Sequence, residues 1–301
     1  MTLGIDIGGT NIKFGIIDDN YCVLERRSIP TRTEASAAAI IADIIEVCLD
    51  LKKAFPYQKI GIGTPGAVDS KHGICIKAAN LPFRNTPIVQ TIEEATGIKS
   101  TLANDANCAV TGELYAGVGQ QYKNFIMVTL GTGVGGGIVI DGKVYQGFRS
   151  GAGEIGHMII DYAGLPCPCG QNGCWEQYAS VNALIRQTKH AAVDAPNSLL
   201  ASMCAESVTG RTVFEAIEKG CDVAKQVLDT YTNYILTGIS SLDYIFQPEA
   251  VVLCGAVTNQ GPALLDPILR KQITPSKIFI SNLKNDAGII GAAAVAMHTN
   301  S

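Results

Sequence analysis

The chain contains the same short layout twice, and this repeat constrains its fold more than any other feature. Residues 4–19 read GIDIGGTNIKFGIIDD, and residues 128–142 read VTLGTGVGGGIVIDG. Each stretch predicts an apolar strand, a turn of glycine and threonine, a second apolar strand and a turn that contains aspartate. A duplication of this kind predicts two related lobes, with their Gly-rich turns facing each other across a cleft.

The rest of the chain predicts helices that alternate with strands, which is typical of an α/β protein. Helices are expected over 34–55, from Thr86-Pro87 to Gly97, over 104–119, 176–190 and about 210–246, and over 286–299; further strands are expected at 59–68 and 251–257. We expect residues 1–118 with 289–301 to form a smaller N-terminal lobe, and residues 119–288 a larger C-terminal lobe.

Composition excludes several classes of function. Apolar residues make up 47% of the 301 residues and charged residues 17%, which is enough apolar material for a large core. The net charge is −4 without a dense basic block, so no nucleic-acid partner is indicated. Neither a signal segment nor a run of about 18 apolar residues is present, which predicts a cytoplasmic protein without membrane partners and with its ten cysteines reduced.

The two Gly-Thr turns are candidate phosphate cradles. Glycines let backbone N–H groups converge on an anion, and the threonine hydroxyl adds a donor. Asp6 could hold Mg²⁺ directly or through water, and Lys13 offers a positive charge nearby. One such turn alone is better read as an ordinary hairpin, but two matching turns favour phosphoryl transfer, which needs donors around both the transferred and the retained phosphates.

Two other glycine patterns are misleading. GTGVGG at 131–136 fits the dinucleotide fingerprint, but β-prone GGIVIDGKV follows where that fingerprint requires a helix. GIVIDGK at 137–143 imitates the start of a P-loop, but Val144 stands where serine or threonine is required.

A cluster of metal-ligand residues lies in the second half of the chain, at His157, Cys167, Cys169 and Cys174. Three thiolates and an imidazole suit tetrahedral zinc, and four protein ligands leave no open position, so the metal would be structural. The alternative is a metal-free loop of reduced residues. The zinc would hold the loop that carries Glu154, His157 and Glu176.

The segments DIGGTNIK, LGTGVGGG, GEIGH and CPCGQNGCWE together resemble the ROK family of sugar kinases. The resemblance runs from residue 4 to the last predicted helix. It implies the two-lobed actin/hexokinase-type ATPase fold, with ribonuclease H-like duplicated lobes, ATP between them and a sugar in the cleft. It also implies ATP-dependent phosphorylation of a hexose hydroxyl, most simply glucose to glucose 6-phosphate, by a homodimer that uses Mg²⁺ and a structural Zn²⁺.

The resemblance also assigns roles to single residues. It implies that Asp105 is the catalytic base, although locally Asp105 is also a candidate helix N-cap and Glu154 a candidate solvated charge. The implied sugar-binding residues are Gly66, Asn80, Asn104, Asp105, Glu154, His157 and Glu176, with His157 also a zinc ligand. The expected ATP-binding residues are Gly8, Gly9, Thr10, Asn11, Lys13, Gly131, Thr132, Gly133 and Gly255.

Two departures from the family pattern affect the substrate sites. Phe83-Arg84 stands where the family often has Gly-Trp, which leaves the sugar open, and Cys254 and Ala256 replace glycines on either side of Gly255. An N-acylmannosamine, fructose or allose kinase is therefore the alternative within the class.

Other classes fit less well. A sugar-sensing ROK-type repressor would carry an added N-terminal helix-turn-helix, and the first strand starts at residue 3, which leaves no room for one. An ATPase of the actin/Hsp70 type would lack the GEIGH and cysteine segments.

Overall fold

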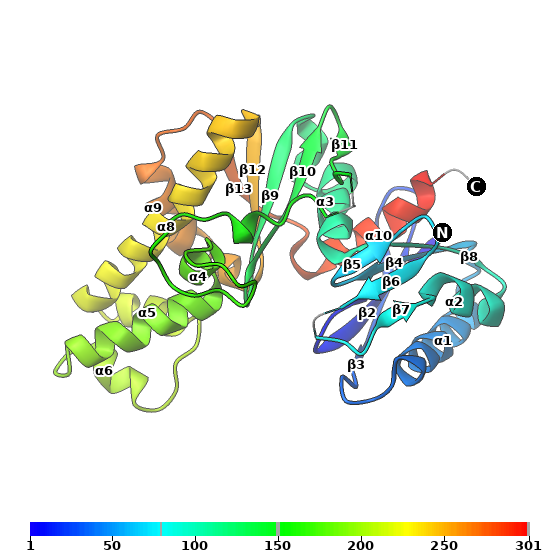
Figure 1. Ribbon diagram of the computed structural model, residues 1–301, viewed down its shortest axis with the longest axis horizontal. Helices are drawn as coiled ribbons and strands as arrows, with labels where there is room; N and C mark the ends of the chain where they lie inside the picture. Colours follow the sequence, from blue (N-terminus) through cyan, green and yellow to red (C-terminus); the bar gives the residue numbers. More distant parts are fainter. Residues whose placement is uncertain (79, 149–150, 300–301) are drawn as a thin grey trace. The chain divides into compact units, whose positions relative to one another are not determined.

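The computed structural model describes residues 1–78, 80–148 and 151–299 of the chain (Figure 1). The strands are β1 (Thr2–Ile7), β2 (Asn11–Ile17), β3 (Val23–Pro30), β4 (Lys59–Thr64), β5 (Ala67–Asp69), β6 (Ile74–Lys77), β7 (Arg84–Thr86), β8 (Lys99–Asn104), β9 (Phe125–Leu130), β10 (Val134–Ile140), β11 (Lys143–Val144), β12 (Ala250–Cys254) and β13 (Lys277–Ile280). The helices are α1 (Ala37–Ala54), α2 (Ile88–Thr96), α3 (Asp105–Ala116), α4 (Glu176–Ala179), α5 (Val181–Asp194), α6 (Leu199–Cys204), α7 (Thr212–Glu218), α8 (Asp222–Phe246), α9 (Pro262–Lys271) and α10 (Ala287–His298). Short 3₁₀ helices are η1 (Val118–Gln121), η2 (Ile155–His157), η3 (Ala256–Gln260) and η4 (Lys284–Asp286).

The chain forms two compact units. The first unit contains Met1–Lys123, Gly137–Ala152 and Asn282–Ser301, and the second contains Asn124–Gly136 and Gly153–Ser281. The boundary runs through β10. This division places 119–123, 137–152 and 282–288 with the N-terminal segment, whereas they were expected in the larger lobe; the predicted lobe limits stay a prediction.

Two five-stranded sheets share one strand order. They run β3-β2-β1-β4-β8 and β11-β10-β9-β12-β13. In each sheet the two strands of the repeat, β1 with β2 or β9 with β10, are neighbours, and two strands from later in the chain extend the sheet beyond the first of them. In the first sheet β1 and β2 are antiparallel, while β1, β4 and β8 are parallel. In the second sheet β9, β12 and β13 are parallel. The duplication predicted from the sequence is therefore confirmed by the strand order.

The first sheet buries different side chains on its two faces because strand residues alternate. Leu3, Ile5 and their counterparts on neighbouring strands join the apolar side chains of α1 and α2 in one core cluster. The glycines between them leave room for α10: a Cβ on Gly4 would lie 1.9 Å from the Ile289 carbonyl oxygen, and one on Gly61 would lie 1.7 Å from that of Ala292. The alternation of glycine with large apolar residues in β1 and β4 thus fixes which helix covers which face.

Capping residues set the ends of the first two helices. The Ser36 hydroxyl accepts from the Ala39 N–H at the start of α1, and α2 ends at the predicted Gly97, which is in the left-handed conformation (φ 70°). The single helix predicted over 176–190 is instead two helices, because Ser180 is extended and caps α5 through the Ala183 N–H.

The second unit builds its helices around α8. The indole of Trp175 packs on α8, where a Cβ on Gly238 would lie 2.0 Å from the ring, and its N–H donates to the Tyr234 carbonyl at 2.7 Å. This contact fixes the start of α4. Among the described residues, no helix is long and apolar enough to cross a bilayer.

Candidate active site

In the first unit, predicted site residues lie at the carboxyl ends of three adjacent parallel strands. Asp6 is near the end of β1 and pairs in register with Gly63 on β4, and Thr64 at the end of β4 pairs with Asn104 at the end of β8. Parallel α/β sheets bind ligands at this edge. The sheet therefore brings together side chains that are nearly 100 positions apart in the sequence.

Asp6, Lys13 and Asp105 form an electrostatic group. The Lys13 ammonium lies 3.9 Å from the Asp6 carboxylate across the β1-β2 hairpin. Burial raises the pKa of Asp6; Lys13 opposes this and the charge of Asp105 adds to it. Two nearby carboxylates, with the Lys13 ammonium beside one of them, are a donor set that suits a hard divalent cation.

Asn104, and not Asp105, caps α3. The Asn104 side-chain oxygen accepts from the N–H groups of Ala106 and Asn107, and its amide donates to the Gly66 carbonyl at 3.1 Å. The local interpretation of Asp105 as the cap is therefore wrong. Asp105 is the first helical residue, and burial raises its pKa, although the Ala106 N–H opposes this by donating to its carboxylate.

The first Gly-Thr turn is a tight connection between β1 and β2. The Gly8 N–H donates to the Asn11 carbonyl at 3.0 Å, and Thr31 holds the turn from outside by donating its hydroxyl to the Gly8 carbonyl at 2.7 Å. A Cβ on Gly9 would lie 3.9 Å from the Asn80 Cβ, so Asn80 is beside the turn. Within the described part of the chain, the Gly9 and Thr10 N–H groups have no hydrogen-bond partner, which leaves them available to an anion.

In the second unit, the turn at Gly131–Gly133 and the residue Gly255 follow the carboxyl ends of the adjacent parallel strands β9 and β12. The Gly131 N–H donates to the Gly133 carbonyl at 3.0 Å, and the Val181 N–H at the start of α5 donates to the Gly131 carbonyl at 2.8 Å. β10 follows the turn directly, so the Rossmann interpretation rejected above is also excluded by the structure.

A cavity of about 460 Å³ adjoins both segments. Its lining residues are Val181, Gly210, Arg211, Ala256, Val257, Asn259 and Gln260. Gly255 has φ 101°, and a Cβ there would lie 2.4 Å from the Leu130 carbonyl oxygen, so glycine is required at this position. The departures at positions 254 and 256 leave it in place: Cys254 is buried, and Ala256 begins η3 at the cavity wall.

The predicted zinc ligands are close together. Each of His157, Cys167, Cys169 and Cys174 offers a ligand atom, and these atoms lie within 4.8 Å of one another. His157 Nδ1 is 3.6 Å from Cys167 Sγ, and Cys169 Sγ is 3.5 Å from Cys174 Sγ. A tetrahedral zinc with bonds of about 2.0 Å to nitrogen and 2.3 Å to sulfur separates its ligands by roughly 3.5–3.8 Å. The residues therefore fit zinc.

The two glutamates of this region have different settings. Glu154 is exposed and precedes η2, which carries His157. Glu176 is the first residue of α4 and is 19% exposed; its Oε1 accepts from the Cys167 thiol at 3.1 Å and lies 3.9 Å from His157 Nδ1. Since Nδ1 faces the cysteines, the other ring nitrogen of His157 is the one left for a ligand.

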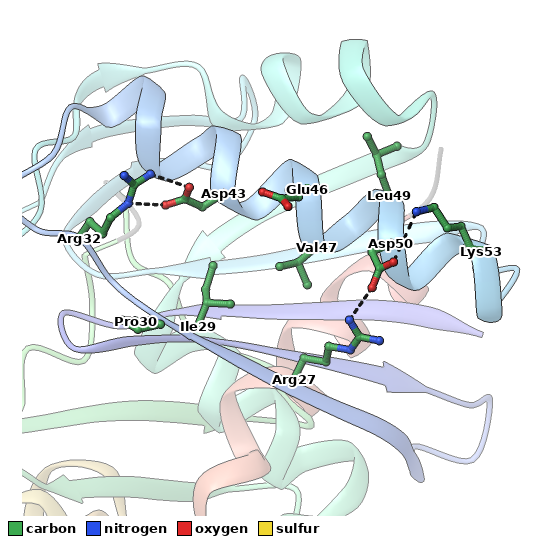
Figure 2. A pocket seen from close by; sticks show the side chains of 10 residues that line it. All are labelled: Arg27, Ile29, Pro30, Arg32, Asp43, Glu46, Val47, Leu49, Asp50 and Lys53. Atoms are coloured by element: carbon green, nitrogen blue, oxygen red, sulfur yellow. Dashed lines mark hydrogen bonds and ion pairs between the residues drawn. The ribbon is translucent and has the colours of Figure 1, made fainter.

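Another cavity, of about 730 Å³, lies in the first unit between β3 and α1 (Figure 2). Arg32 forms two hydrogen bonds to Asp43, and the Asp50 carboxylate binds Arg27 and Lys53. No predicted site residue lines this cavity. The Arg27–Asp50 ion pair joins the edge strand β3 to α1, and Arg32, just after β3, pairs with Asp43 of the same helix, so we assign the cavity a structural role.

Two groups of site residues were missed by the sequence analysis. Thr31 lies 21 positions after Thr10 and carries no motif, so its position beside the turn depends on the pairing of β2 with β3. Val181 reaches the cavity from the start of α5 and Arg211 from the residue before α7, and neither carries a sequence pattern. Asn259, which also lines the cavity, could have been predicted as a site residue, because it lies only four positions after the predicted ATP-binding residue Gly255.

Comparisons with known proteins agree with this geometry. The sequence pattern of the ROK family matches residues 2–299. Glucokinase from Streptomyces coelicolor is 33% identical over 98% of this chain and 97% of its own length. The crystal structure of a ROK family glucokinase from Streptomyces griseus in complex with glucose and AMPPNP is 32% identical, with a TM-score of 0.85 and 99% of both chains covered. The xylose repressor of Bacillus subtilis is 29% identical over 92% of this chain but only 69% of its own length.

These matches extend over nearly the whole chain, and the two related sheets are those of the ROK kinases with the hexokinase-type fold that the sequence predicted. The chain belongs to the ROK family.

Proposed function

We propose that this protein is an ATP-dependent sugar kinase that phosphorylates glucose to glucose 6-phosphate. One observation carries the proposal: Asp105 is half-buried at the carboxyl end of the parallel strands, beside Asn104, whose amide donates to the Gly66 carbonyl. The similar glucokinases described above support glucose as the sugar.

Asp105 acts as the base. A sugar hydroxyl attacks the γ-phosphorus of ATP, the bond to the β-phosphate oxygen breaks, and the hydroxyl proton passes to the Asp105 carboxylate. Because the phosphoryl transition state is loose, positioning of the hydroxyl matters more than the strength of the base. The pKa raised by burial makes Asp105 a better proton acceptor than an exposed aspartate.

The first unit supplies one set of groups for the two substrates. Gly66, Asn80 and Asn104 bind sugar hydroxyls, and the turn from Gly8 to Asn11 with Lys13 binds phosphate. The N–H groups of Gly9 and Thr10, which have no partner among the residues that the structure describes, support this assignment. Asp6 would hold Mg²⁺, which neutralises charge on the phosphates when bound.

The second unit supplies the other set. Gly131, Thr132 and Gly133 bind phosphate, and the cavity beside Gly255 takes the adenosine. Glu154, His157 and Glu176 bind sugar hydroxyls, since carboxylates accept hydrogen bonds from polyols. Zn²⁺ held by His157, Cys167, Cys169 and Cys174 would fix the backbone of this region and take no part in the chemistry.

A coupled assay for ADP formation with a panel of hexoses and N-acetylhexosamines tests the proposal. We expect the largest kcat/KM with glucose and a fall in kcat of about 10²-fold or more for Asp105→Asn, while the dissociation constant for glucose changes little. If N-acetylmannosamine, fructose or allose is phosphorylated in preference to glucose, the proposed substrate is wrong but the proposed reaction, ATP-dependent sugar phosphorylation, stands.

A sugar-binding regulator is the competing function, because repressors share the family. Such a protein would bind sugar without ADP formation, and the same assay separates the two. The expected homodimer stays a prediction that light scattering of the purified protein would test.

A further inference from the structure

The Glu176 carboxylate lies between two parts of the second unit, with one oxygen toward the cysteine cluster and the other toward the Gly131–Gly133 turn. Its Oε1 is 3.1 Å from the Cys167 thiol in the cysteine cluster. Its Oε2 lies against the Gly131–Gly133 turn, so that a Cβ built on Gly133 would be only 2.6 Å from that oxygen. The carboxylate therefore fills the space that any side chain at position 133 would need.

The backbone that carries Glu176 has little freedom to move away. Trp175, the preceding residue, is completely buried and bonded through its indole N–H to Tyr234. At the other end of α4, the Tyr231 hydroxyl donates to the Ala179 carbonyl at 2.8 Å. The next helix begins at Val181, whose N–H is bonded to Gly131 at 2.8 Å. The segment is thus fixed to α8 and to the turn itself.

An added methyl at position 133 would consequently move the carboxylate and leave the fold intact. The Glu176 side chain can move its terminal carboxylate by changing rotamer, at a small cost in free energy. Gly156 offers a contrast: a Cβ there would lie 1.9 Å from the Val134 carbonyl oxygen, which belongs to β10 and cannot turn away. Substitution at Gly133 therefore perturbs a site, whereas substitution at Gly156 perturbs folding.

We propose that Gly133 positions Glu176 for the sugar, so that this turn determines sugar affinity as well as contacting phosphate. The inference rests on the proposed function in taking a hexose as the ligand of Glu176. Gly133 is a positioning residue, because it acts only through the Glu176 carboxylate, whose hydroxyl contacts lose their alignment when a Cβ occupies its place.

A double-mutant cycle tests this coupling without turnover. Glucose dissociation constants are measured by calorimetry, in the absence of nucleotide, for the wild type, Gly133→Ala, Glu176→Ala and the double variant. We expect Gly133→Ala to weaken glucose binding about 10-fold or more, the loss typical of a hydrogen bond to a charged group. In the Glu176→Ala background the same substitution should change affinity less than about 2-fold, because nothing remains to displace.

Gly131→Ala is the matched control on the same turn. A Cβ at Gly131 would have no atom within 4 Å, and its backbone conformation is open to alanine. Its glucose affinity should stay within about 2-fold of the wild type. Equal losses for Gly133→Ala with and without Glu176, or an equal loss for Gly131→Ala, would overturn the proposal.

A crystal structure of Gly133→Ala decides the matter if glucose binding by Glu176→Ala is too weak to measure. The carboxylate should leave its wild-type position, and finding it unmoved would contradict the inference. If the wild type binds another hexose of the panel, the cycle is run with that sugar. If it binds none, the proposed function fails, while the structure of the variant still tests whether Gly133 positions Glu176.

Discussion

At the scale of single residues, environment separates aspartates that look alike in the sequence. Asp6 lies one residue before the end of β1 and Asp105 begins α3, and burial raises the pKa of both. Asp6 has an ammonium beside it, whereas Asp105 is partnered by backbone N–H and the neighbouring Asn104. This difference suits the first to a cation and the second to a proton.

The raised pKa of Asp105 predicts a stability effect with a definite sign. A carboxyl whose folded pKa exceeds its unfolded value binds protons more readily when folded, so its contribution to stability is lost as pH rises through that interval. Asp105→Asn, which cannot ionise, should therefore be more stable than the wild type at pH 7. Thermal unfolding followed by circular dichroism should show this gain shrinking below about pH 4, where both states of the wild type are protonated. A gain that persists at low pH would assign the effect to something other than ionisation.

The sequence could identify these residues but not their exact local roles. Asn104 and Asp105 are both good capping residues, and only the backbone conformation of Asn104, with its bonds to Ala106 and Gly66, decides between them. Likewise, no pattern links Gly133 to Glu176, since the contact arises when α4 is fixed on α8.

At the scale of elements, apolar periodicity and capping residues predicted the strands and helices that carry strong patterns, such as β1, α1 and α2. Elements without a clear pattern were missed. β3 reads VLERRSIP and is an edge strand with mostly exposed side chains, so it shows no alternation of core residues. α9 begins with proline and carries another inside, which conceals a helix from sequence reasoning.

The cysteine cluster predicts zinc in the purified protein. We expect about one zinc per chain by elemental analysis, and loss of that zinc in Cys169→Ser, because three ligands hold the ion poorly. Removal by a chelator should also change the emission of Trp175, the chain's single tryptophan, which follows Cys174 directly. Cys204→Ser is the control, since Cys204 is outside the cluster. Full zinc content in Cys169→Ser would contradict the assignment.

The contact of Trp175 with α8 predicts that a glycine-to-alanine substitution in this helix destabilises the protein, the opposite of the usual effect. Glycine to alanine within a helix is usually stabilising by about 0.5–1 kcal/mol. Gly238→Ala should instead destabilise by about 1–3 kcal/mol, because the new methyl overlaps the Trp175 ring. Adding Trp175→Phe removes part of that ring and should recover some stability in urea unfolding followed by circular dichroism. A stabilised Gly238→Ala would mean that the indole is not fixed there.

At the scale of the whole molecule, the repeat predicted two related α/β sheets, and the strand order confirms them. The division of the chain was harder to predict: residues 289–301 were expected with the N-terminal segment, but contacts also place 137–152 and 282–288 in the first unit. A repeat marks where related strands begin, but it carries no information on which unit a later segment packs against.

The return of the C-terminus to the first unit leads to a prediction about truncation. α10 contributes buried Ile289, Ile290 and Ala293 to one cluster and Ala292 to another, and it covers the glycine face of β1 and β4. Those strands position Asp6 and Gly66, so a chain that ends at Asp286 should lose kinase activity and expose apolar surface to a dye such as ANS. The second unit does not include α10, so Trp175 should keep the emission of a buried indole. A chain that ends after His298 keeps the whole helix and is the control; native thermal stability in the shorter chain would show that α10 is dispensable to the first unit.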